Sequence, residues 1–168
     1  MNTTNTDINT ALQNRFETAC TDIFTENKLT ITALVPSDAI LKNLQVIATV
    51  GLTSDIQGNL FLGCSHEAVI SLSRDLYSAQ GIKADPKSIE TLARSTLGEI
   101  TNQVAGRAIM YLTEIDLDCN ITPPTVFSGN ALQSELYAAE HRFGLIINGT
   151  FGDIILHVEI KNMKKKTE

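Results

Sequence analysis

The sequence has few cysteines, and their spacing does not suit a metal or redox site. Its three cysteines, Cys20, Cys64 and Cys119, are odd in number and far apart along the 168 residues. A disulfide framework needs paired cysteines, and a metal or redox motif needs closely spaced ones, so neither fits. We therefore expect buried, reduced thiols, as in a cytoplasmic protein.

Basic charge and long apolar runs are also lacking. Thirteen lysines and arginines against nineteen acidic residues give a net charge of −6, which argues against a nucleic-acid-binding surface. No stretch approaches the roughly 18 apolar residues that a membrane-spanning helix needs. The first residues, MNTTNTDINT, have neither the basic segment nor the apolar run of a secretory signal. We expect a cytoplasmic protein with no nucleic-acid or membrane partner.

What is present describes an ordinary globular chain. Hydrophobic residues make up 43% of it and charged residues 19%, and a chain of this size can bury a core without a metal or disulfide. No repeat of 20–50 residues is evident. We expect one domain over 1–168, with 1–7 and 162–168 as flexible tails.

Hydrophobic periodicity predicts both helices and strands. Helices are expected over about 8–27, 66–80 and 86–114, and strands over about 29–36, 44–52, 56–64, 136–150 and 152–162. Ser65 and Asp85 are predicted N-caps, Gly81 a helix end, and Asn148-Gly149 a hairpin turn. The segment 119–134 is expected to be a turn-rich connection. These elements predict an α+β fold in two layers, with helices packed on one face of a largely antiparallel sheet.

The long helix has two distinct faces. With about 100° per residue, one side forms an apolar stripe, made of Ile89, Ala93, Leu97, Ile100, Val104, Ala108, Tyr111 and Ile115. Glu99 and Asn102 fall on the opposite side together with Ser95 and Gly106, and Gly98 lies beside them. A glycine costs a helix interior up to about 1 kcal/mol relative to alanine. We interpret Gly98 and Gly106 as leaving a smooth surface for another protein; close packing within the chain is the alternative for Gly106.

This pattern resembles a known family. The string Ser95-x3-Glu99-x2-Asn102, followed by AGRA and then by PPTV at 123–126 with Gly129, resembles the CheC/CheX/FliY family of chemotaxis phosphatases. The CheX branch is the most similar. The resemblance covers essentially the whole chain in length and in the order of its elements, so it implies a CheX-like fold.

The resemblance also implies a function. Family members dephosphorylate the phosphoaspartyl form of CheY-like receiver domains in chemotaxis and two-component signalling. Carried over here, Asn102 would orient the attacking water and Glu99 would pair with a lysine of the partner. Ser95, Gly98 and Gly106 would contribute to docking. No cofactor is expected on this chain, because the magnesium ion would belong to the partner's phosphorylation site. A homodimer formed by pairing sheet edges is implied as well.

One departure from the family pattern concerns the first helix. Relatives with two motifs carry a second Glu-x-x-Asn there, whereas this chain has Glu17-x2-Cys20, so no second site is expected. Pro123 and Pro124 are expected to shape the exit from the long helix, with only an indirect effect on the docking face.

Other candidate sites are weaker, and two other functions stay open. His66, His141 and His157 lack metal-ligand spacing, so no metal site is expected. Ser65 lacks the Gly-x-Ser-x-Gly context of a nucleophile, and GTFGD is a hairpin rather than a phosphate loop, because no helix follows it. The first alternative function is a non-catalytic module that binds a receiver domain or a flagellar switch component. The second is a small-molecule sensor.

Overall fold

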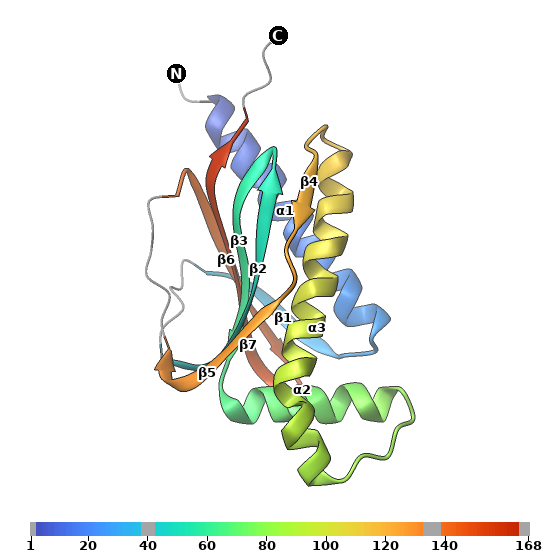
Figure 1. The fold of residues 1–168 in the computed structure, drawn as a ribbon. Coiled ribbons are helices and arrows are strands. Elements are labelled where there is room, and N and C mark those ends of the chain that lie inside the picture. Colours follow the sequence, from blue (N-terminus) through green and yellow to red (C-terminus); the bar gives the residue numbers. More distant parts are fainter. Residues whose placement is uncertain (1–2, 38–42, 133–138, 165–168) are drawn as a thin grey trace.

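The computed structural model describes residues 3–37, 43–132 and 139–164. These residues form three helices and seven strands (Figure 1). The helices are α1 (Thr3–Glu26), α2 (His66–Ala79) and α3 (Pro86–Thr113). The strands are β1 (Ile31–Pro36), β2 (Leu44–Ser54), β3 (Ile56–Cys64), β4 (Cys119–Ile121), β5 (Thr125–Leu132), β6 (His141–Gly149) and β7 (Gly152–Met163).

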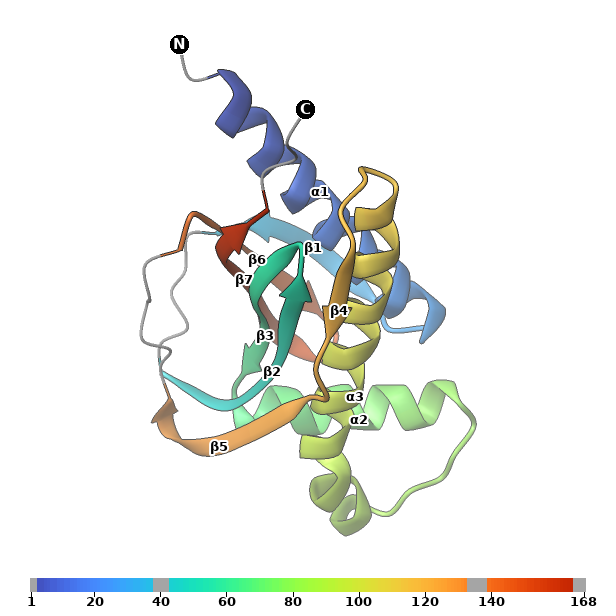
Figure 2. The ribbon, with the colours of Figure 1, turned by 45° about the horizontal axis from the view of Figure 1, so that its top comes forward.

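The strands form a single antiparallel sheet. Its order is β1-β6-β7-β3-β2-β4, and β5 also pairs with β2. The long strand β2 thus has two partners on the same side: β5 along Leu44–Thr49 and β4 along Leu52–Ser54. Figure 2 shows β4 and β5 following one another along this side of the sheet. The predicted α+β architecture is confirmed.

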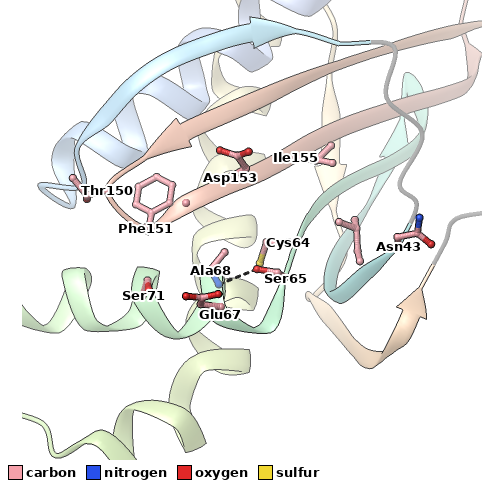
Figure 3. A pocket seen from close by; sticks show the side chains of 12 residues that line it. Asn43, Cys64, Ser65, Glu67, Ala68, Ser71, Thr150, Phe151, Asp153 and Ile155 are labelled. Carbon is pink, nitrogen blue, oxygen red and sulfur yellow. Dashed lines mark hydrogen bonds between the residues drawn. The ribbon is translucent and has the colours of Figure 1, made fainter.

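Two helix starts are fixed by side-chain caps, as the sequence predicts. The Ser65 hydroxyl accepts a hydrogen bond of 3.1 Å from the backbone N–H of Ala68 at the start of α2 (Figure 3). The Asp85 carboxylate accepts from the backbone N–H groups of Lys87 and Ser88 at the start of α3, where Pro86 occupies the first turn. At the end of α2, Gly81 has a positive φ of 72°, a conformation that glycine adopts without steric cost.

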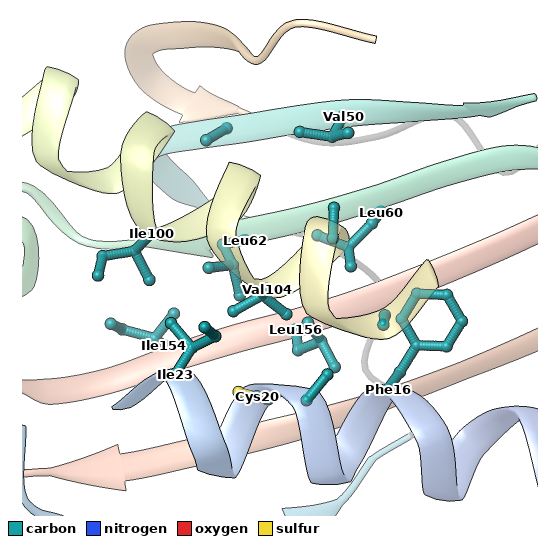
Figure 4. Close-up of a cluster of buried hydrophobic side chains, with 14 of the residues drawn as sticks. Phe16, Cys20, Ile23, Val50, Leu60, Leu62, Ile100, Val104, Ile154 and Leu156 are labelled. Carbon is teal, nitrogen blue, oxygen red and sulfur yellow. The ribbon is translucent and has the colours of Figure 1, made fainter. Parts of the chain in front are cut away.

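All three helices pack on one face of the sheet, and the core lies between the two layers. Side chains from α1 and α3 meet those of β2, β3 and β7 there, as Figure 4 shows for Phe16, Ile100 and Leu156. Cys20, Cys64 and Cys119 are free and buried, as predicted. None of the three helices in the described residues is long and apolar enough to cross a membrane.

The opposite face of the sheet carries a smaller apolar cluster and a buried polar pair. Leu44 and Ile47 form the cluster with partly buried neighbours. On β7, His157 Nε2 lies 3.2 Å from Glu159 Oε1, and both side chains are buried. Burial lowers the pKa of His157 from its ordinary value of 6.5, Glu159 opposes that shift, and Arg142 adds to it.

The connection predicted over 119–134 is wrong for most of its length, because it contains β4 and β5. Neither segment has the alternation of an independent strand. Both become strands by pairing with the edge of β2 that does not pair with β3, in the registers Leu52↔Ile121 and Ala48↔Val126. The last predicted residues, 133 and 134, lie outside the described residues.

Several element ends also differ from prediction, among them the end of β2 at Ser54 and the start of β6 at His141. The β6–β7 turn lies at Thr150 and Phe151, because Asn148 and Gly149 remain in register with Asp153 and Gly152. Helix α1 begins at Thr3, within the expected tail, since polar residues extend a helix without any apolar periodicity. Strand β7 runs to Met163 because it pairs with the start of β3. The predicted tail residues 1–2 and 165–168 lie outside the described part.

Candidate functional site

Glu99 and Asn102 lie on the outer side of α3, as the periodicity predicts. Their neighbours Ile100 and Val104 are fully buried against the sheet, which turns Glu99 and Asn102 away from the core. Glu99 is exposed and Asn102 is half-buried. A spacing of three residues makes the two side chains neighbours on adjacent turns of the helix. A carboxylate and a carboxamide therefore stand side by side on one accessible surface.

The Asn102 carboxamide is not used for internal structure. Within residues 3–37, 43–132 and 139–164, no hydrogen bond joins it to another group. Ser95, two turns earlier, is exposed on the same side of the helix. The Asn102 amide thus keeps its donor and acceptor capacity for molecules from outside.

Glu99, in contrast, is held on one side. Gln103 Nε2 donates a hydrogen bond of 2.9 Å to Glu99 Oε1, and Gln103 Oε1 accepts one of 2.9 Å from Asn27 Nδ2. Asn27 lies just after the end of α1, so this chain of bonds joins two helices. Neither Gln103 nor Asn27 was predicted to contact Glu99 or its neighbours. The spacing of four residues could have suggested Gln103, but no local signal indicates Asn27.

The prediction that Gly98 lies open on the surface is wrong. Gly98 is buried, and a Cβ atom added to it would lie 2.9 Å from Cγ2 of Val126 and 4.0 Å from Cβ of Pro124. Arg94 Nη2 also donates a hydrogen bond of 3.3 Å to the Val126 carbonyl. The absent side chain lets Val126 of β5 pack closely on α3, and Pro124 lies beside the same position of the helix.

Gly106 has open space at its Cβ position, as the surface placement predicts. It is half-buried, and an added Cβ atom would meet no other atom within 4 Å, which excludes close packing within the described chain as its reason. Two large apolar side chains are exposed on the same side of α3, Leu92 at 38% and Met110 at 61%. We call Leu92, Ser95, Glu99, Asn102, Gly106 and Met110 the outer face of α3. It combines polar groups at its centre with apolar groups at both ends.

One hollow in the described residues lies away from the outer face of α3. It has a volume of about 600 Å³ and lies between the start of α2 and the β6–β7 turn (Figure 3). The acidic groups Glu67 and Asp153 line it, whereas no lysine, arginine or histidine among the described residues does. Ser65, also in its lining, is engaged as the cap of α2. Such an acidic lining disfavours an anionic ligand, so a small-molecule sensor of that kind gains no support from this hollow.

Metal and second-site candidates remain without support. Among the described residues, no group of three histidine, cysteine or acidic side chains is arranged to hold a metal ion. On α1, Glu17 lines a shallow polar hollow, but Cys20 is fully buried in the core. The position that would need a free polar group in a second motif is therefore closed to solvent.

Comparison with known proteins decides the family. The family model described as "Chemotaxis phosphatase CheX" matches residues 46–148, more than half of the chain and all of α3. The chain belongs to the CheX family of chemotaxis phosphatases. This confirms the resemblance inferred from Glu99, Asn102 and the PPTV segment, and it makes the chain a phosphatase.

One relative is similar enough in sequence to support the same assignment. It is the CheY-P phosphatase CheX of Thermotoga maritima, 30% identical over 122 residues, which cover 70% of this chain and 72% of the relative.

Solved structures agree on the fold. CheX in a CheX–CheY–BeF3–Mg²⁺ complex from Borrelia burgdorferi has a TM-score of 0.72 at 18% identity, covering 89% of this chain and 97% of the other. CheX from Desulfovibrio desulfuricans has a TM-score of 0.71 at 16% identity, covering 89% and 98%. FliY from Thermotoga maritima is also similar, with a TM-score of 0.62 at 16% identity and coverage of 95% and 91%.

Proposed function

We propose that this CheX-family phosphatase hydrolyses the aspartyl phosphate of a CheY-like receiver domain, using the outer face of α3. The observation that carries the proposal is that an exposed Glu99 lies next to Asn102 on the helix surface. The Asn102 carboxamide makes no hydrogen bond within the described chain. The Thermotoga relative is a CheY-P phosphatase by name, and the Borrelia structure contains CheX together with CheY. Both names support the proposed substrate class.

Asn102 orients the attacking water in this proposal. Hydrolysis of an acyl phosphate needs a water in line with the departing aspartyl oxygen, and positioning supplies much of the rate in phosphoryl transfer. The carboxamide oxygen accepts a hydrogen bond from that water, while the amide nitrogen donates to a phosphoryl oxygen. The half-exposed position of Asn102 lets a partner's phosphoryl group come within hydrogen-bond distance.

Glu99 fixes the register of the complex. Its carboxylate pairs with a lysine of the receiver domain, in a charge-assisted contact that forms only when the phosphoryl group faces Asn102. The magnesium ion is part of the partner's phosphorylation site, where it neutralises phosphoryl charge. The chain itself contributes one orienting amide and one docking carboxylate.

The proposal includes a homodimer and a cytoplasmic location. Strand β1 pairs only with β6 among the described strands, so its other edge is available for a second copy. Sedimentation velocity across a range of protein concentrations tests the dimer, and a single monomeric species throughout would contradict it. Receiver domains of chemotaxis act inside the cell, so a fluorescent fusion should distribute through the cytoplasm.

The decisive experiment follows the loss of phosphate from a phosphorylated receiver domain. We expect wild-type protein to accelerate this loss and Asn102→Ala to reduce the acceleration by about a hundredfold, because the water loses its orienting group. Asn162→Ala, which changes an exposed asparagine on β7, is the matched control and should act like wild type. If wild-type protein binds without acceleration, the chain is the non-catalytic binding module; if Asn102→Ala keeps full activity, its role is wrong.

A further inference from the structure

A chain of hydrogen bonds links the end of α1 to the working face of α3. Asn27 Nδ2 donates to the Ile23 carbonyl at 2.8 Å and to Gln103 Oε1 at 2.9 Å, and Gln103 Nε2 donates to Glu99 Oε1 at 2.9 Å. Asn27 and Gln103 are both half-buried, whereas Glu99 is exposed. The order of donors and acceptors is chemically consistent, because the Asn27 amide has two protons and Gln103 accepts on one side and donates on the other.

The Ile23 carbonyl determines the direction of this chain. A carbonyl oxygen can only accept, so the Asn27 side chain must turn its nitrogen, not its oxygen, toward it. The second proton of that nitrogen then faces Gln103 and requires the Gln103 oxygen on that side. The Gln103 nitrogen is left facing Glu99 as a donor to a carboxylate, which is a stronger bond than one between neutral groups.

We propose that Gln103 is a positioning residue for Glu99 and that Asn27 sets its orientation, through the relay Asn27–Gln103–Glu99. This inference rests on the proposed function, in which Glu99 pairs with the partner's lysine. Gln103 holds Oε1 of Glu99, while Oε2 makes no hydrogen bond within the described chain. A glutamate loses much rotamer freedom when it is immobilised, so holding it in advance lowers the entropic cost of docking.

The seam between α1 and α3 offers a contrasting set of contacts. Arg107 makes two hydrogen bonds of 2.8 Å to Glu26, and Arg15 makes one of 2.6 Å to Glu114. These pairs join the helices without touching Glu99. If Gln103 only joined the two helices, as these pairs do, its substitution would change stability alone. If Gln103 positions Glu99, its substitution changes the affinity for the partner.

The first test measures binding and turnover separately. For Gln103→Ala we expect Kd for a beryllium-fluoride-loaded receiver domain, and KM for its phosphorylated form, to rise roughly two- to tenfold. kcat should stay close to that of wild type, because Asn102 is unaffected. Gln57→Ala, on an exposed site of β3, is the matched control. Unchanged Kd and KM in Gln103→Ala would overturn the proposal.

A double-mutant cycle then identifies the route of the effect. In a Glu99→Ala background, Gln103→Ala should have no further effect on Kd, because the group that it positions is gone. An equal rise in both backgrounds would mean that Gln103 contacts the partner directly or acts through the fold, and the proposal would fail. Thermal unfolding of each variant checks that all are folded under the assay conditions.

The third test changes the orientation of the relay. Asn27→Asp replaces the donor with an acceptor, so Gln103 should turn its nitrogen toward α1 and its oxygen toward Glu99. We expect Kd to rise at least as much as in Gln103→Ala. Thr25→Asp adds the same charge at an exposed site of α1 and should leave Kd near the wild-type value. Equal effects of Asn27→Asp and Thr25→Asp would assign the change to charge and overturn the role of Asn27.

An NMR measurement separates this inference from the proposed function. The side-chain amide protons of Gln103 should shift in Glu99→Gln protein without any partner present, since a charge-assisted bond becomes a neutral one. If wild-type protein binds the receiver domain without hydrolysing the phosphate, the proposed catalysis is wrong. The double-mutant cycle, which is measured by Kd, still tests the relay in that case. Gln103 protons that do not respond to Glu99→Gln would overturn the relay, whatever the activity.

Discussion

At the scale of single residues, Gly106 is the clearest sign that α3 serves more than stability. Glycine inside a helix costs up to about 1 kcal/mol relative to alanine. Among the described residues outside the surrounding helix backbone, no atom would lie within 4 Å of a Cβ at Gly106. Periodicity alone placed Gly106, Glu99 and Asn102 on the outer side of the helix. It could not distinguish Gly106 from Gly98, because the difference depends on a strand that is distant in sequence.

Gly106→Ala should therefore stabilise the protein and weaken its association with a partner. We expect the free energy of unfolding to rise by up to about 1 kcal/mol, measured by urea denaturation. Kd for the receiver domain should rise, because the new methyl group would protrude from the proposed docking surface. A variant that is more stable and binds equally well would remove Gly106 from the contact.

His157 gives a prediction about pH. Burial lowers its pKa in the folded protein, so below about pH 6.5 the unfolded chain takes up a proton that the folded chain does not. Stability contributed by neutral His157 is complete above that pH and is lost as the pH falls. Between pH 7.5 and 5.5, His157→Gln should lose less of its unfolding free energy than wild type does, as measured by urea denaturation at each pH. His66→Gln, at an exposed histidine, is the control, and equal losses in all three proteins would contradict the assignment.

At the scale of elements, helix α3 could be predicted from the sequence, whereas the strands β4 and β5 that lie beside it could not. The apolar stripe and the Asp85 cap are local signals, so they fix the helix and its buried side. Strands β4 and β5 exist because β2 offers them a partner, and such pairing leaves little trace in a segment's own sequence. The hydrogen bond between Asn27 and Gln103 could not be predicted from local sequence either, because 76 positions separate the two residues.

The packing of β5 on α3 can be tested at Gly98. Gly98→Ala places a methyl group 2.9 Å from Val126 Cγ2, and overpacking of this kind costs about 1–3 kcal/mol. Removing the opposing methyl groups with Val126→Ala should reduce that cost in the double variant. If Gly98→Ala stabilises the protein as Gly106→Ala is expected to, β5 does not pack closely on α3 at this position.

At the scale of the whole molecule, the three thiols report on how the fold opens. They lie on α1, β3 and β4, and burial raises the pKa of Cys20 and Cys64 to about 12 and that of Cys119 to about 11. Since the thiolate is the reactive form, native protein should react with a disulfide reagent only slowly, and all three thiols should react at once in urea. Cys119, on a three-residue strand, should react first in the native state. Cys119→Ser should remove that early phase, and an early phase that persists would contradict this order.

Strand β5 has one further consequence. It forms part of a margin of the sheet and, through Val126, also covers the residue immediately before Glu99. A molecule that added a strand along that margin would pair with the same strand that packs on this turn of α3. A partner at that margin would therefore lie one strand away from the turn of α3 that carries Glu99, which Val126 meets both at Gly98 and through the hydrogen bond from Arg94.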